Sequence, residues 1–316
     1  MRKTAFLYLL LTLSSNILSQ PTLRYYNYKW EETIPKYGAF YSITNQTDTT
    51  FQREDYFVAT KKLQMSGAYS NATEKVKIGK FYWFHSNGQL ERVGNYLNGK
   101  RDGVWLSYYE NGIMEDSSFY ENDKIVSSFF SWYKNGYQRD SITRINDSST
   151  VSISWFDMGG VSGAGRFLNE KKSGKWNYYH RSGTKSSAEI YYNGILKSKT
   201  YFSENSEIVD TTKFADKSST FKNGKEDWIN YMSNSLYYPA NLKLENTDKI
   251  VVVVIFDIDE DGKVVNARVK TPFHFEYDKI ALDVINKSPK WKPAFLNNRY
   301  FISSFQQAVF FSERED

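Results

Sequence analysis

The chain has 316 residues and a net charge of +5, with 25 Tyr and 22 Phe but only 6 Pro and no Cys. This length accommodates one to three domains, and the many aromatic residues favour β-rich structure. A chain without cysteine has no disulfides, thiol nucleophile or thiolate metal site. Acidic and basic residues are interspersed without a long basic run, which argues against nucleic-acid binding.

Residues 1–19 have the composition of a secretory signal. Arg2 and Lys3 form a positive start, and a short apolar run follows from Thr4 to Leu13. Such a run is shorter than the roughly 20 residues that cross a hydrocarbon core. We therefore predict a signal peptide at 1–19, cleaved before Gln20, with an uncleaved membrane anchor as the alternative. Because the chain lacks cysteine, a lipid anchor on an N-terminal cysteine is excluded.

A pattern of glycine and aromatic residues returns about every 24 residues. Gly79, Gly103 and Gly174 are each followed two residues later by Phe or Trp, and five residues later by Phe or Tyr. Self-similarity at a fixed period of this length indicates a repeat architecture.

Two interleaved series of turn-like dipeptides divide this pattern. Asn-Gly is a strong hairpin signal, because both central residues of a type I′ turn need positive φ. The spacing leaves strands of about 5–8 residues, so we predict a ribbon of consecutive β-hairpins over 57–195. The first series is Asn87-Gly88, Asn111-Gly112, Asn135-Gly136, Met158-Gly159 and Ser182-Gly183; the second is Asn98-Gly99, Asn122-Asp123, Asn146-Asp147, Asn169-Glu170 and Asn193-Gly194.

Aromatic residues precede the second series by two positions, at Tyr96, Tyr120, Phe167 and Tyr191. We expect them to stack across neighbouring strands. The pattern Gly-x-Trp-x-x-Tyr-Tyr-x-x-Gly, with Asn-Gly-Lys-x-x-Gly, resembles the MORN repeat in the variant found in the bacterial YwqK-like antitoxin family. The resemblance implies an elongated sheet of hairpins; in eukaryotic proteins the repeat is linked to membrane lipids or partner proteins.

The flanks of the repeats lack this period. Residues 20–56 are predicted to supply edge strands or an N-terminal cap, because the first unit of a stack has no neighbour on one side. Residues 196–220 gain Ser, Thr, Lys and Asp. We interpret them as a last strand and a linker, which places a domain boundary there.

Residues 221–316 have the pattern of a small α+β domain. Its predicted order is helix, strand, strand, helix, strand, and the two central strands are joined by a tight turn at Asp261-Gly262. The predicted elements are a helix at 227–235, strands at 249–256 and 263–270, a helix at 275–286 and a final strand at 300–311.

This segment resembles the C-terminal domain of TonB proteins. The matching residues are Phe221-Lys-Asn-Gly224, Tyr238-Pro239, Phe256-Asp257, Asp261-Gly262, Val264, Val269 and Trp291-Lys292-Pro293. The family often has a glycine before the first strand, where this chain has Asn246-Thr247-Asp248. The resemblance implies that an extended peptide of an outer-membrane transporter or other envelope protein pairs with the final strand. The partner-binding residues it implies are Tyr238, Pro239, Tyr300, Phe301, Phe305 and Gln307.

These features predict a non-enzymatic, exported interaction protein, periplasmic or associated with the outer membrane of a Gram-negative bacterium. The alternative is a TonB-family energy transducer that couples an inner-membrane motor to outer-membrane transport. Such transducers carry an N-terminal anchor and a long Pro-rich spacer, whereas this chain has six prolines. A third interpretation treats the repeats as a scaffold that binds membrane surfaces or cell-wall glycans.

Candidate chemical sites have simpler structural explanations. The run Asp257–Gly262 imitates the start of a calcium loop, but its twelfth position is Arg268 where that loop needs Glu. His85 and His180 occupy equivalent repeat positions and are expected to be surface residues at strand ends. The glycine cluster at 159–165 lacks the strand-to-helix context of a phosphate loop, so we interpret it as a bulged repeat turn. We therefore predict no enzyme activity, no cofactor and no metal.

Aromatic residues of the repeats are the remaining candidates for a ligand groove on the sheet. Core and cross-strand packing is expected to account for most of them. They are Trp105, Tyr109, Trp132, Tyr133, Trp176 and Tyr179.

Overall fold

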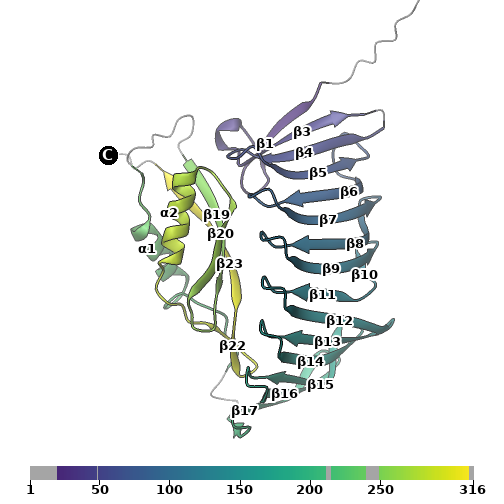
Figure 1. Cartoon of the computed structure of the whole chain (residues 1–316), viewed down its shortest axis with the longest axis vertical. Helices are drawn as coiled ribbons and strands as arrows, with labels where there is room; N and C mark the ends of the chain where they lie inside the picture. Colours follow the sequence, from purple (N-terminus) through teal and green to yellow (C-terminus); the bar gives the residue numbers. More distant parts are fainter. Residues whose placement is uncertain (1–19, 48, 211–214, 240–248, 313–316) are drawn as a thin grey trace, which may run out of the picture.

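The computed structural model describes residues 20–47, 49–210, 215–239 and 249–312. The predicted signal peptide at 1–19 and the loop residues 246–248 lie outside these ranges. The described chain is mainly antiparallel β-structure, with a long sheet of consecutive hairpins and a smaller part that contains both α-helices and stands beside it (Figure 1). Within these ranges, no helix is both long and apolar enough to cross a membrane.

The long sheet confirms the predicted ribbon of hairpins and extends beyond 57–195 on both sides. Each strand from β3 to β9 pairs with the next, β9 pairs with β11, and the pairing continues to β18. β1 pairs with β2 and β3, and β10 pairs with β9.

The strands of the long sheet have the following bounds: β1 Thr22–Tyr26, β2 Glu32–Thr33, β3 Phe40–Gln46, β4 Phe51–Phe57, β5 Leu63–Tyr69, β6 Lys77–Phe84, β7 Leu90–Leu97, β8 Lys100–Tyr108, β9 Met114–Glu121, β10 Lys124–Ile125, β11 Phe129–Trp132, β12 Gln138–Asn146, β13 Ser149–Trp155, β14 Val161–Leu168, β15 Lys171–Tyr179, β16 Lys185–Tyr192, β17 Ile195–Phe202 and β18 Ile208–Val209. A short 3₁₀ turn, η1, covers Pro35–Tyr37.

The two edges of the long sheet carry different turns. In the second series, Asn98 and Gly99 both have positive φ, at 51° and 81°, as a type I′ turn requires. The first series differs from our prediction: of Asn87-Gly88, only Gly88 has positive φ, and its N–H donates to the His85 carbonyl at 2.8 Å. This is a type I turn closed by a glycine bulge, and Asn87 Oδ1 stabilises it by accepting the Gln89 N–H at 2.9 Å.

In three strand pairs of the long sheet, an aromatic ring packs on a glycine of the preceding strand. The ring of Trp105 in β8 covers Gly94 in β7, where an added Cβ would stand 2.1 Å from the indole. Gly103, with φ of 74°, lies in a bulge of β8 that turns the ring over Gly94. Gly165 and Trp176 repeat this arrangement, with Gly174 in the bulge.

The predicted aromatic contacts across neighbouring strands are present at Tyr96 and Tyr120, but the rings meet edge to face, at interplanar angles of 90° and 74°, and do not stack. The ring centroids of Tyr96 and Trp105 are 5.1 Å apart, and those of Trp105 and Tyr120 are 6.0 Å apart.

The prediction that the glycine cluster at 159–165 is a bulged repeat turn was only partly right. Gly159 lies in a turn, whereas Gly163 and Gly165 lie within β14 beneath the rings of β15.

The C-terminal part contains the helices and strands that the sequence predicted, with one addition. Its three-stranded sheet has the order β20-β19-β23 and is antiparallel. The final predicted strand is divided into β22 and β23, and β22 forms a hairpin with β21 that the sequence pattern did not predict. The elements are α1 Lys225–Ser235, β19 Lys249–Ile258, β20 Val264–Thr271, α2 Phe275–Asn286, β21 Ala294–Leu296, β22 Arg299–Phe301 and β23 Ser303–Ser312.

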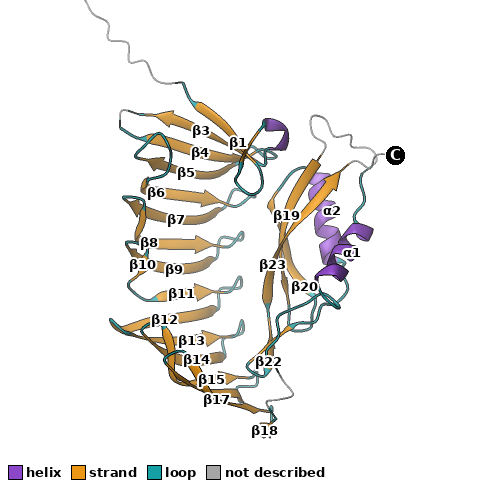
Figure 2. Ribbon diagram, turned by 180° about the vertical axis from the view of Figure 1, so that it is seen from behind, coloured by secondary structure: helices purple, strands orange, loops and turns teal. Residues whose placement is uncertain are grey.

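The core of this C-terminal part lies between the sheet and the helices. Both helices cover the face of the three-stranded sheet that points away from the hairpins (Figure 2). Alternate residues of β19, such as Val252 and Val254, are fully buried there against Ile285 of α2. The opposite face of this sheet, which we call the outer face, is turned toward the long sheet (Figure 1).

Candidate binding cleft between the long sheet and the C-terminal part

The outer face stands opposite the row of first-series turns, and polar contacts join the two. Ser86 Oγ donates to the Val269 carbonyl of β20 at 3.1 Å. Further along the row, Arg181 donates to Glu260 of the β19–β20 turn at 2.6 Å. These contacts fix the orientation of the outer face relative to the turns.

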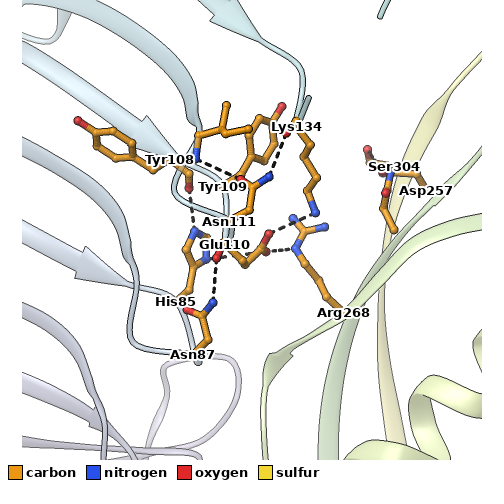
Figure 3. Close-up of polar contacts among 12 residues, drawn as sticks. His85, Asn87, Tyr108, Tyr109, Glu110, Asn111, Lys134, Asp257, Arg268 and Ser304 are labelled. Carbon is orange, nitrogen blue, oxygen red and sulfur yellow. Dashed lines mark hydrogen bonds and ion pairs between the residues drawn. The ribbon is translucent and has the colours of Figure 1, made fainter. Parts of the chain in front are cut away.

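Glu110 is the centre of the contact with β20 (Figure 3). Its carboxylate forms an ion pair with Arg268 and lies 3.3 Å from Lys134 Nζ of the next turn. Burial opposes ionisation of this carboxyl, but a backbone hydrogen bond and the two cations outweigh it, so the pKa of Glu110 is lowered. The group is therefore a fixed negative charge at neutral pH.

A ladder of asparagines ties successive first-series turns together. Asn87 Nδ2 donates to the Glu110 carbonyl at 2.9 Å, and Asn111 Nδ2 donates to the Lys134 carbonyl at 2.9 Å. Asn135 continues the ladder to the Asp157 carbonyl at 2.8 Å. Each turn is thus anchored by the next.

A second ladder runs through the first residue of each turn. The Tyr109 hydroxyl donates to the Trp132 carbonyl at 2.8 Å, and Tyr133 makes the same bond to Trp155. His85 and His180 occupy equivalent positions and bond through Nε2 to the carbonyls of Tyr108 and Phe202. The prediction that they are surface residues was wrong, because both rings lie between adjacent hairpins; His180 is only 9% exposed.

The β21–β22 hairpin inserts into the far end of the cleft. Asn297 and Asn298 have φ of 55° and 61°, so they form the type I′ turn of this hairpin. Asn297 is 5% exposed, and its Nδ2 donates to the buried carboxylate of Glu189 at 2.8 Å. Asn298 Nδ2 donates to the Phe202 carbonyl at 2.8 Å, and Arg299 donates to the Tyr179 carbonyl at 3.0 Å.

Cavities remain between these contacts. One of them measures about 730 Å³ and receives side chains from the turns and strands of the long sheet and from β19, β20, β22 and β23. Of the six aromatic residues proposed for a groove, Tyr109 and Tyr133 line it, whereas Trp105 and Trp176 are buried in the ring-on-glycine packing. A second cavity of about 400 Å³ lies between β20 and the hairpins nearer the N-terminus.

The residues predicted to bind a partner are not brought together. Tyr300 is 54% exposed and lines the 730 Å³ cavity with Phe301. Phe305 points to the core and lies 5.0 Å, centroid to centroid, from Trp291.

The other three predicted residues, Gln307, Tyr238 and Pro239, also lie on the core side of the C-terminal part. Gln307 accepts the indole N–H of Trp228 at 2.8 Å. Tyr238 packs its ring on Tyr277 at 5.6 Å, and Pro239 is buried. Their role is therefore packing beneath the sheet.

The backbone of β23 is nevertheless available along one edge. β23 pairs with β19 over its full length, from Ser303 to Ser312. Within the part of the chain that the structure describes, no strand pairs with its other edge. Such an edge presents unpaired backbone donors and acceptors.

The calcium-like run forms a hairpin turn, as predicted. Asp259 Oδ1 accepts the N–H groups of Asp261 and Lys263 at 3.0 and 2.7 Å. Gly262 packs against the Trp291 backbone, and Arg268 pairs with Glu110 instead of facing the loop. Among the described residues, no group of three or more His, Asp or Glu side chains is arranged to hold a metal.

Comparisons with known proteins give little. The chain matches no protein-family model and no curated protein. Among solved structures it is similar to one described as "Crystal structure of GtfA/B complex bound to UDP and GlcNAc", at 10% identity, over 46% of this chain and with a TM-score of 0.18. The match spans 27% of the length of that chain. At this TM-score, the likeness carries no argument about function.

Proposed function

We propose that this protein is a non-enzymatic, exported interaction protein of the cell envelope, whose C-terminal part binds an extended partner peptide by strand addition. The unpaired edge of β23 is the observation that carries the proposal. In strand addition, backbone hydrogen bonds supply affinity, and pockets for alternate side chains supply specificity.

The surroundings of the sheet favour this edge over other surfaces. The helices cover one face, and the row of turns occupies much of the other. At the opposite edge of the sheet, Arg268 and Val269 of β20 already contact the long sheet. β23 is ten residues long, and its ring contact with that part of the chain is between Phe310 and Tyr28, at 5.9 Å between centroids.

The sequence resemblances suggest the biological setting. Likeness to TonB C-terminal domains supports an outer-membrane transporter or other envelope protein as the partner, and likeness to MORN repeats supports a scaffold role for the hairpins. Export is tested by mass spectrometry of the protein isolated from cells. A start near Gln20 is expected, whereas retention of residues 1–19 contradicts cleavage and favours the energy-transducer alternative.

Strand addition is tested by hydrogen exchange on the full chain. Peptides selected by phage display on the intact protein supply the probes. A bound peptide is expected to slow amide exchange in β23, with β20 as the internal reference. Failure to select any peptide, or protection confined to β20 or the hairpins, contradicts the proposal.

A further inference from the structure

We propose that the 730 Å³ cavity is a binding site for an oxyanion, a carboxylate or phosphate group, held by Arg299. This inference goes beyond strand addition, because it concerns side chains in the cleft and not the backbone edge of β23. It assigns the cavity a small polar ligand with one acidic group.

The balance of charge around the cavity identifies Arg299. Every other cation that lines it has a carboxylate partner, whereas within the described residues no carboxylate forms an ion pair with Arg299. The pairs are Arg139 with Asp140, Arg181 with Asp157 and Glu260, and both Arg268 and Lys134 with Glu110.

The surroundings of Arg299 leave its charge poorly solvated. One nitrogen donates to the Tyr179 carbonyl, and the guanidinium carbon lies 4.8 Å from the centre of the Phe156 ring. Arg181 lies 4.9 Å from the same ring, so a second cation is close. Burial lowers the pKa of Arg299, although a guanidinium stays protonated in proteins. Glu260 attracts this cation but is already paired with Arg181. A desolvated cation with no ion pair of its own is unfavourable, and an incoming oxyanion would offset that penalty through paired N–H donors.

The walls of the cavity restrict the rest of the ligand. Its volume lies within the range of about 300–1,000 Å³ typical of small-molecule sites. Tyr133 and Tyr300 provide aromatic surfaces. Acidic side chains in the lining disfavour a polyanion and suit an uncharged body rich in hydroxyl groups, as in an acidic sugar. These acidic residues are Glu115, Asp140, Asp157, Asp257 and Glu260.

Protection from chemical modification tests this on the unaltered full chain. Phenylglyoxal modifies arginines, and peptide mapping measures the rate at each one. Glucuronate or glucose 6-phosphate at ten times its Kd is expected to slow modification of Arg299 about tenfold, whereas glucose does not. Arg144, which pairs with Asp147 outside the cavity, serves as the internal control. The probe that protects shows whether the oxyanion is a carboxylate or a phosphate.

Variants provide the second measurement. By calorimetry, Arg299→Gln is expected to lose binding of the protecting probe, Arg299→Lys to weaken it less, and Arg144→Gln to keep it. If Arg299→Gln does not fold, the protection experiment on the unaltered chain decides. Equal protection of Arg299 and Arg144, no protection by either acid, or full binding by Arg299→Gln overturns the inference.

Discussion

At the scale of single residues, two glycines serve one indole ring in different ways. Gly94 leaves room for Trp105, and Gly103 adopts the positive φ that turns the ring over Gly94. The sequence pattern revealed Gly103 because its spacing to the ring is constant. It did not reveal Gly94, whose role depends on contact between neighbouring strands.

The first prediction concerns this packing. Gly94→Ala places a methyl group within 2.1 Å of the indole, so it is expected to destabilise the fold by about 1–3 kcal/mol, the usual effect of overpacking. Gly160→Ala is the control, because its nearest neighbour is a Phe156 atom at an ordinary 3.8 Å. Urea unfolding of both variants measures the difference, and equal effects would contradict the packing role of Gly94.

A buried carboxyl gives the second prediction. Burial raises the pKa of Asp278 in α2 to about 6, even though the carboxylate accepts the Phe273 N–H at 2.9 Å. The folded state therefore holds this proton more tightly than the unfolded state does, and stability falls as pH rises from about 4 to 6.

Asp278→Asn removes this titration but keeps an oxygen that can accept the Phe273 N–H. It is expected to stabilise the protein by about 2 kcal/mol at pH 7, and to have little effect below pH 4. Thermal unfolding across pH measures this. The half-exposed Asp283 of the same helix supplies the control variant, Asp283→Asn. A stabilisation that is the same at pH 4 and pH 7 would refute the titration argument.

At the scale of elements, hairpins with a repeated turn signal were predictable, and the isolated β21–β22 hairpin was not. Four of the five second-series turns have the positive φ values of a type I′ turn, as Asn-Gly and related pairs predict, whereas neither Asn146 nor Asp147 does. Asn297-Asn298 carries a related signal, but it stands alone between short strands after Pro293. A period of 24 residues supports each repeat hairpin with its neighbours, whereas this one depends on tertiary contacts that no local pattern contains.

The third prediction tests the docking of this hairpin. Asn297→Ala leaves the buried Glu189 carboxylate without one of its donors, at an expected loss of about 1–3 kcal/mol. Hydrogen exchange is expected to rise in β21, β22 and β16 before it rises elsewhere. Asn223→Ala removes an exposed asparagine of the same C-terminal part and is the control. Unchanged exchange in β16 would show that the hairpin does not depend on this bond.

At the scale of the whole molecule, the cleft could not be predicted because its walls come from distant parts of the chain. Glu110 and Arg268 each look like ordinary surface residues in the sequence, and only the fold places them together. Of the partner-binding residues suggested by resemblance, Tyr300 and Phe301 reach the cleft. Phe305 and Gln307 both point to the core, since residues two apart in a strand share a face, whereas Tyr238 and Pro239 pack from the segment after α1.

The fourth prediction measures the coupling between the two walls. A double-mutant cycle of Glu110→Gln and Arg268→Gln is expected to give a coupling free energy of about 0.5–1 kcal/mol, because both side chains are partly exposed. High salt should reduce it. The same cycle on Arg144 and Asp147, within one exposed turn, is expected to give a smaller coupling. Equal coupling free energies would mean that the ion pair across the cleft stabilises the protein no more than the exposed Arg144–Asp147 pair does.

The central claim is strand addition at β23, and an N-methyl scan of a selected peptide tests it most directly. Each peptide amide is methylated in turn, and Kd is measured on the full chain. Because alternate backbone groups of an added strand point toward the edge, methylation is expected to weaken binding at every second residue and to have little effect between them. A uniform tolerance of methylation, or losses that follow side chains without this alternation, would contradict the account.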